Sequence, residues 1–132
     1  MLGLLMAAPS CRVLVVDDDE DSAQTFAFLL AGVGHEARHL TDPARVLRTV
    51  ARFRPHIVFL DIAMPGMTGW ELAAALRKQY SYDVLRLIAL TAHGEDQDRV
   101  RSRQAGFDAH ILKPVSMDLV ESTIEQLFPK RV

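Results

Sequence analysis

The chain has 132 residues, of which 49% are hydrophobic and 24% charged, and its formal net charge is −2. That balance is typical of a single compact domain. The sequence has no basic stripe and no apolar run of bilayer length, which argues against nucleic acid as a partner and against membrane insertion. Cys11 is the only cysteine, so no internal disulfide can form, and we expect a cytoplasmic protein.

The first ten residues, MLGLLMAAPS, are apolar and imitate a signal peptide. They lack a positively charged start, and their short apolar run leads directly into a strand-like segment. We therefore expect residues 1–10 to be a leader or a flexible N-terminus, and residues 11–132 to form the domain.

Five strand-like segments follow one another along the chain, separated by helical patterns. Most are rich in β-branched and aliphatic residues, as expected for strands that are buried on both faces of a sheet. In chain order the segments are CRVLVV (11–16), the weaker HEARHL (35–40), HIVFLD (56–61), RLIALTA (86–92) and AHILKP (109–114).

The helical patterns differ in the strength of their apolar stripes. In the first, four residues share one helical face that we expect to be buried: Ser22, Phe26, Leu29 and Val33. The pattern over residues 95–104 is helical in propensity but nearly without an apolar stripe, and we expect only Val100 and Ala105 to be buried.

Capping residues predict where three of the later helices begin. Asp42 is expected to be an N-cap, with Pro43 in the first helical position. Thr68 and Glu71 have the spacing of a capping box. Ser116 is expected to cap the last helix.

Five strand–helix units in sequence predict an α/β fold, in which helices cover both faces of a parallel sheet. In such sheets, ligands bind beyond the carboxyl ends of the strands. The polar residues at these ends are therefore expected to face one crevice: Asp17, Asp18, Asp61, Thr91 and Lys113.

Three carboxylates, a lysine and a hydroxyl at one crevice suit the chemistry of phosphate and metal ions. Mg²⁺ prefers oxygen ligands, and a bound ion would relieve the repulsion between Asp17 and Asp18. An aspartate can also attack phosphorus and form an aspartyl phosphate. Lys113 would then neutralise charge on the phosphoryl group, and Thr91 would donate a hydrogen bond to it.

Four motifs occur in the order VLVVDDDED, FLDIAMPGMTGWE, ALTA and ILKP. Together they resemble the receiver domain of two-component response regulators, over the chain from Arg12 to Phe128. The resemblance implies a doubly wound, flavodoxin-like (βα)5 fold with strand order 2-1-3-4-5. It also implies a module that catalyses only its own phosphorylation and dephosphorylation, rather than an enzyme with a separate substrate.

The resemblance assigns a role to each matching residue at the strand ends. Asp61 corresponds to the aspartate that accepts the phosphoryl group, and Thr91 and Lys113 correspond to the hydroxyl and the lysine that contact it. Asp17 and Asp18 correspond to the acid pair that holds Mg²⁺. Asp18 would bind the ion directly, and Asp17 mainly through water.

Other positions follow the family less closely. Ala63 would offer its backbone carbonyl to the metal, but it has no polar side chain to place a hydrolytic water. Pro114 corresponds to a proline preceded by a cis peptide bond. His93 could reach the phosphoryl group or the attacking water. His110 takes the place of the aromatic residue that switches together with Thr91, and we expect an imidazole there to make the switch sensitive to pH.

The resemblance implies that a histidine kinase or a histidine phosphotransfer protein donates the phosphoryl group, and that the output partner is a protein, not identified by the sequence. Because no effector segment follows Val132 here, we expect a stand-alone regulator or a receiver cut from a hybrid histidine kinase.

One alternative is a haloacid-dehalogenase phosphatase, but its Asp-x-Asp-x-Thr pattern would need a threonine at position 21, where this chain has Asp21. Another is an inert receiver, which would usually have lost the Asp, Thr or Lys.

Overall fold

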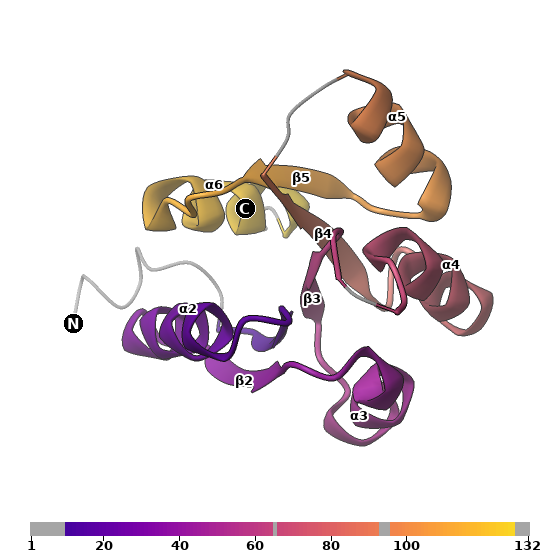
Figure 1. The fold of residues 1–132 in the computed structure, drawn as a ribbon. Helices are drawn as coiled ribbons and strands as arrows, with labels where there is room; N and C mark the ends of the chain where they lie inside the picture. The colour runs from indigo at the N-terminus through magenta and orange to yellow at the C-terminus, as the bar shows by residue number, and fades with distance from the viewer. Residues whose placement is uncertain (1–9, 65, 93–95, 129–132) are drawn as a thin grey trace.

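The computed structural model describes residues 10–64, 66–92 and 96–128 of the chain. Within these residues, five parallel strands form one sheet in the order β2-β1-β3-β4-β5 (Figure 1). The strands are β1 (Arg12–Val16), β2 (Glu36–Leu40), β3 (Ile57–Asp61), β4 (Arg86–Thr91) and β5 (Ala109–Leu112). The expected α/β flavodoxin-like class and its strand order are confirmed.

Helices cover both faces of the sheet. On one face lie α2 (Glu20–Gly32) and α6 (Met117–Leu127), and on the other lie α3 (Val46–Phe53), α4 (Gly69–Gln79) and α5 (Asp96–Ala105) (Figure 1). A short 3₁₀ turn, η1 (Pro43–Arg45), leads into α3. In the part of the chain described, no helix has the length and apolar character needed to cross a bilayer.

Alternating strand residues divide the core into two apolar clusters. On β1, Leu14 and Val16 belong to the cluster under α3 and α4, whereas Val13 and Val15 belong to the cluster under α2 and α6. All five residues of β3 are buried, because helices cover this central strand on both sides. The unbroken apolar runs of the sequence therefore reflect strands without a solvent-facing side.

The predicted N-caps lie where the sequence places them. The Asp42 carboxylate accepts a hydrogen bond from the backbone amide two residues on, although the first turn there is η1 rather than α-helix. Thr68 and Glu71 form a reciprocal capping box at the start of α4. The Ser116 hydroxyl accepts a hydrogen bond from a backbone amide in the first turn of α6. These caps satisfy amides that a helix start would otherwise leave without partners.

The sequence predicts the wrong buried face for α2. Phe26 is buried as expected, but Leu29 and Val33 are 43% and 48% exposed. The residues of α2 that are buried are instead Ala23, Phe26, Ala27 and Leu30. The two alanines let the helix lie close to the sheet, where the Phe26 ring packs edge-on against Phe59 with centroids 4.8 Å apart.

Helix α5 is attached largely through polar contacts. Val100, which was expected to be buried, is 54% exposed, while Ala105 is partly buried against the core. The buried Ser102 accepts a hydrogen bond of 3.0 Å from the Trp70 indole, and the Arg101 guanidinium carbon lies 3.9 Å from the centre of that ring. A helix bound in this way needs no apolar stripe.

A buried ion pair joins α4 to the amino ends of β4 and β5. Arg77 is 11% exposed and Asp108 is 8% exposed, and they approach to 2.7 Å. Arg77 also donates hydrogen bonds to the carbonyls of Gly106 and Leu85, at 2.8 and 2.6 Å. The Asp108 carboxylate accepts a further bond of 2.8 Å from the Leu87 amide. Because both charges are buried and hydrogen-bonded, the pair is costly to break.

We expect the substitution Arg77→Met to lower the free energy of unfolding by about 3 kcal/mol, because it leaves the Asp108 carboxylate buried without its principal cation. Urea denaturation followed by Trp70 fluorescence measures the loss. The neighbouring Lys78 is exposed on the same helix, and Lys78→Met should change the stability by less than about 0.5 kcal/mol. Equal effects of the two substitutions would contradict this role of Arg77.

Candidate functional site

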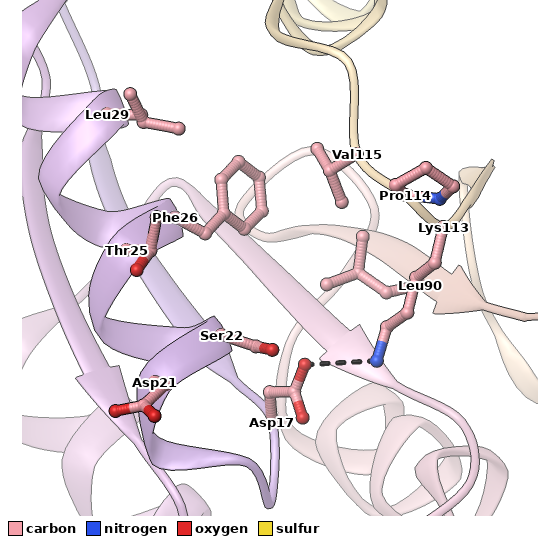
Figure 2. A pocket seen from close by; sticks show the side chains of 10 residues that line it. All are labelled: Asp17, Asp21, Ser22, Thr25, Phe26, Leu29, Leu90, Lys113, Pro114 and Val115. Atoms are coloured by element: carbon pink, nitrogen blue, oxygen red, sulfur yellow. Dashed lines mark hydrogen bonds and ion pairs between the residues drawn. The ribbon is translucent and has the colours of Figure 1, made fainter.

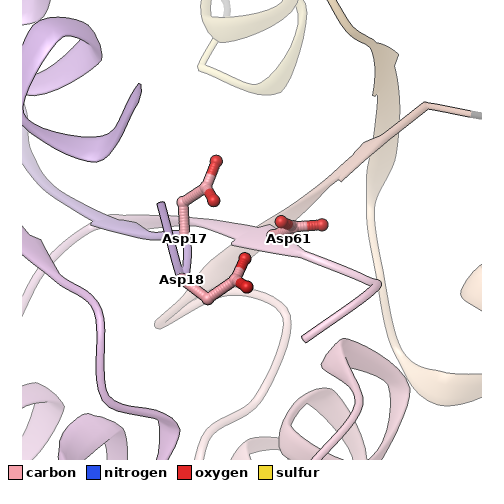
Figure 3. Close-up of side chains that lie close together, drawn as sticks. All are labelled: Asp17, Asp18 and Asp61. Atoms are coloured by element: carbon pink, nitrogen blue, oxygen red, sulfur yellow. The ribbon is translucent and has the colours of Figure 1, made fainter. Parts of the chain in front are cut away.

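The polar strand ends meet at one edge of the sheet. Asp17 follows β1, Asp61 and Thr91 are the last residues of β3 and β4, and Lys113 follows β5. Because the strands are parallel and neighbouring, all their carboxyl ends lie on the same side. Figure 3 shows the side chains of Asp17, Asp18 and Asp61 lying close together at this edge.

One ammonium group is shared by two buried carboxylates. The Lys113 Nζ donates hydrogen bonds to Asp17 Oδ2 at 3.0 Å and to Asp61 Oδ2 at 3.1 Å. The side chains of Asp17 and Asp61 are 4% and 7% exposed, and that of Lys113 is 31% exposed. Burial strengthens these charge-assisted bonds, because little water competes for them.

The second oxygen of each buried carboxylate is held by the backbone. Asp17 Oδ1 accepts a hydrogen bond of 3.0 Å from the Asp19 amide, and Asp61 Oδ1 accepts one of 3.0 Å from the Ala63 amide. Both donors lie two residues after the carboxylate, in the loops that leave β1 and β3. The loops therefore orient the carboxylates, and the lysine joins them.

Burial and charge act on the protonation of this cluster in opposite directions. Burial raises the pKa of Asp61 above its usual value, and the hydrogen bond and charge of Lys113 only partly oppose this effect. Burial would lower the pKa of Lys113, but its hydrogen bonds to Asp17 and Asp61 and their charges outweigh it and raise the pKa. Burial therefore outweighs the lysine in setting the pKa of Asp61, whereas the two carboxylates outweigh burial in setting the pKa of Lys113.

The three aspartates have the chemistry of a site for a hard divalent cation. One carboxylate oxygen each from Asp17, Asp18 and Asp61 lies within 4.8 Å of the others. Asp18 is exposed, so an ion bound there would remain open to water and to a phosphoryl oxygen. Mg²⁺ needs few protein ligands, prefers oxygen and usually keeps several waters. The residues present therefore fit Mg²⁺.

The remaining candidate residues lie at varying distances from this cluster. Thr91 is buried, and its backbone carbonyl accepts a hydrogen bond of 2.7 Å from the Lys113 amide. The Lys113–Pro114 peptide bond is cis. His110 is half-buried within β5, three residues before the lysine and outside the acidic cluster. His93 lies outside the described residues.

The sequence analysis missed a cavity beside the acids. A cavity of about 600 Å³ opens between α2 and the loop that joins β5 to α6 (Figure 2). Asp17 and Lys113 lie at one end of it, and the side chains of Phe26, Leu29 and Val115 form its apolar wall. The cavity depends on the exposure of Leu29. The helical pattern of the sequence predicted the opposite, so it gave no sign of the cavity.

Gly69 is a second residue that the sequence analysis missed. A Cβ atom at this position would lie 2.5 Å from the Asp61 carbonyl oxygen and 2.8 Å from the Ile62 Cα. The Gly69 amide also donates a hydrogen bond of 2.9 Å to the Ile62 carbonyl. Only glycine allows the start of α4 to approach the end of β3 this closely, so Gly69 positions the backbone of Asp61.

Two curated relatives align with most of this chain. An uncharacterised 76.5 kDa protein of Thiocystis violacea is 31% identical over 114 residues, which are 86% of this chain and 16% of that protein. The DNA-binding response regulator MtrA of Mycobacterium tuberculosis is 34% identical over 103 residues, which are 78% of this chain and 44% of MtrA. The chain therefore spans less than half the length of either relative.

A solved structure and a family match complete the comparison. The chemotaxis protein CheY4 of Vibrio cholerae superposes with a TM-score of 0.83 at 24% identity, over 90% of this chain and 99% of that one. At this identity the likeness establishes the fold. Residues 13–125 match the response regulator receiver domain family. Because that match covers most of the chain, the protein belongs to the response regulator receiver domain family, a class of signalling modules.

Proposed function

We propose that this receiver domain accepts a phosphoryl group on Asp61 from a histidine kinase or a histidine phosphotransfer protein, and that the modification switches a surface that binds an output protein. The observation that carries the proposal is the Lys113 ammonium shared by Asp61 and Asp17, beside the exposed Asp18. A carboxylate held next to a cation and further oxygen ligands is suited to phosphoryl transfer.

Asp61 is the proposed nucleophile. One of its oxygens attacks the phosphorus of a phosphohistidine, an O–P bond forms as the P–N bond breaks, and the leaving imidazole keeps the bonding electron pair. Lys113 neutralises charge on the transferred group, and the Thr91 hydroxyl donates a hydrogen bond to one of its oxygens. The same residues would serve the later hydrolysis of the aspartyl phosphate.

The acidic cluster would hold Mg²⁺ during this reaction. Asp18 and Asp61 would bind the ion directly, Asp17 mainly through water, and Ala63 through its backbone carbonyl. When bound, Mg²⁺ would neutralise part of the negative charge on the phosphoryl group. The three carboxylates support this assignment, because one oxygen of each lies within 4.8 Å of the others.

The proposed switch couples Thr91 to His110. Phosphorylation draws the Thr91 hydroxyl toward the phosphoryl group, and the imidazole of His110 then moves into the space that is released. His110 lies in β5 next to β4, with Ala89 as its partner in the register, so the two residues are on adjacent strands. An imidazole can take up a proton near neutral pH, which a phenyl ring cannot.

The proposal also covers the context of the domain. We assign residues 11–132 to the receiver, whereas the expectation for residues 1–10 falls almost entirely outside the described residues. The domain acts in the cytoplasm, and its output is a protein contact rather than contact with nucleic acid or membrane.

We expect acetyl phosphate and Mg²⁺ to add one phosphoryl group to the protein, and the substitution Asp61→Ala to abolish the addition, because the nucleophilic oxygen is gone. Intact-mass spectrometry measures the product. Asp21 is an exposed acid outside the metal cluster, and Asp21→Ala should be modified as fully as the wild type. Equal modification of Asp61→Ala, or turnover of a small phosphomonoester, would overturn the proposal.

We expect Mg²⁺ to stabilise the fold, by about 2.7 kcal/mol at a concentration of one hundred times its Kd. Urea denaturation with Mg²⁺ and with chelator measures the gain. The substitution Asp18→Asn should remove most of it, because the ion loses a charged ligand. The matched change Asp21→Asn should keep it. A gain that survives Asp18→Asn unchanged would exclude this cluster as the binding site.

We expect a fall from about pH 8 to about pH 6 to favour the activated conformation in the wild type, because the added phosphoryl charge favours a protonated His110, and we expect no such change in His110→Phe. NMR spectra with beryllofluoride as the phosphoryl mimic measure both populations. The phenyl ring fills similar space without a titrating group, so it serves as the matched control. An equal pH response of the two proteins would exclude His110 as its source.

A further inference from the structure

A second cavity, of about 560 Å³, lies at the opposite edge of the sheet from Asp61. It opens where the strands begin, since Arg12 is the first residue of β1, and His56 comes directly before β3. The α3 residue Val50, and Tyr80 and Leu85 from the segment between α4 and β4, complete much of its lining. The cavity thus shares no residue with the phosphorylation site.

The polar groups of this cavity are cationic or hydrogen-bond donors. The Arg12 Nε donates to the Arg54 carbonyl at 2.9 Å, which orients the Arg12 guanidinium. The His56 Nδ1 accepts a bond of 2.9 Å from the Arg12 amide, so the ring carries its proton on Nε2. No acidic side chain lines the cavity, and among the described residues no carboxylate pairs with Arg12 or Arg54.

The positive charge of this cavity acts on its own histidine. Burial lowers the pKa of His56, and the charge of Arg12 lowers it further. The charge of Arg12 disfavours a protonated His56 ring, whereas an anion in the cavity would be attracted by the guanidinium groups of Arg12 and Arg54. The electrostatics therefore favour a negatively charged occupant.

The floor of the cavity is apolar. Val50 and Leu85 are buried, at 2% and 1% exposed, and Tyr80 is half-buried beside them. Ligand pockets typically enclose about 300–1,000 Å³, with a mainly apolar lining and a few polar groups that fix orientation. The size and lining of this cavity match that description, and its polar groups select for charge.

Arg54 occupies a position where glycine is the usual residue. It is the C-cap of α3, with φ +52° and ψ +59° in the left-handed region, which a residue with a Cβ adopts only at a cost in free energy. Its side chain makes no hydrogen bond or ion pair with another described residue that would offset this cost. Arg54 therefore keeps an unfavourable backbone conformation and places a cationic side chain at the edge of the cavity.

We propose that this cavity binds a small organic carboxylate, whose charge is held by the guanidinium groups of Arg12 and Arg54 and whose apolar body lies on Val50, Tyr80 and Leu85. Guanidinium groups bind carboxylates through paired hydrogen bonds. The His56 Nε2–H is a further donor to the ligand. The site is independent of the phosphoacceptor chemistry at Asp61.

NMR titration of the ¹⁵N-labelled protein with 3-phenylpropionate tests the proposal. We expect saturable shifts of the amide signals of Arg12, Arg54, His56 and Leu85. The amide signals of the acidic cluster should not shift. The alcohol 3-phenylpropanol lacks the charge and acetate lacks the apolar body, so each should bind at least about tenfold more weakly. If inorganic phosphate bound as tightly as 3-phenylpropionate, the proposed contact between the apolar body of the ligand and the cavity floor would be wrong.

Substitutions test whether binding depends on the residues that line this cavity. Arg54→Gly removes the guanidinium while relieving the left-handed backbone, so the fold should be kept or stabilised, and binding should weaken at least about tenfold. Arg52 is an exposed arginine of the same helix that does not line the cavity, and Arg52→Gln should bind as the wild type does. Asp61→Ala should also bind normally. Unchanged binding in Arg54→Gly would overturn the proposal.

Discussion

The site depends on one ammonium group that joins the carboxyl ends of three strands. Lys113 follows β5 and donates hydrogen bonds to Asp17 after β1 and to Asp61 at the end of β3. Without it, two buried carboxylates would face each other across the central pair of strands, at a large cost in desolvation and repulsion. The lysine therefore makes the acidic edge compatible with a folded sheet, and it holds the Asp61 carboxylate in place.

Charge is balanced very differently at the two edges of the sheet. At the amino ends of β4 and β5, the Asp108 carboxylate meets Arg77 and Arg86 and is fully enclosed by donors. At the carboxyl ends, three aspartates lie close together, and one lysine pairs with two of them. The first arrangement contributes to stability, whereas the second leaves negative charge that a cation can satisfy. Functional sites commonly keep such an imbalance while the rest of the fold supports it.

The helices around the acidic edge are attached with different strength. Helix α4 begins at Gly69, which lies against the backbone of Asp61, and it buries Leu72 and Leu76 in the core. Helix α5 contacts Trp70 through Ser102 and Arg101, packs Ala105 against the core and exposes Val100. Elements with few buried apolar contacts open at low free energy. The fold thus combines a firmly held Asp61 with an adjacent helix that is less firmly attached.

Local patterns in the sequence determined the order of the elements, the caps at Asp42, Thr68 and Ser116, and the presence of Asp61 and Lys113 at strand ends. Such features depend on residues that are close in the sequence and on which faces of a strand or helix are buried. The spacing of apolar residues indicates both. The motifs around these residues also determined the family. Five apolar runs alternating with helical patterns predicted the sheet architecture, and the absence of polar alternation in most runs is typical of strands covered on both faces.

Only the tertiary structure decided which groups meet through space. It turned Ala23, Phe26, Ala27 and Leu30 of α2 toward the core and exposed Leu29, because the orientation of the helix on the sheet decides which of its apolar residues are buried. It also brought Arg12 beside Arg54 and His56, which are far from it in the chain. Contacts of this kind depend on how strands are ordered and how closely helices approach. No local pattern carries that information, because the partners are neighbours only after folding.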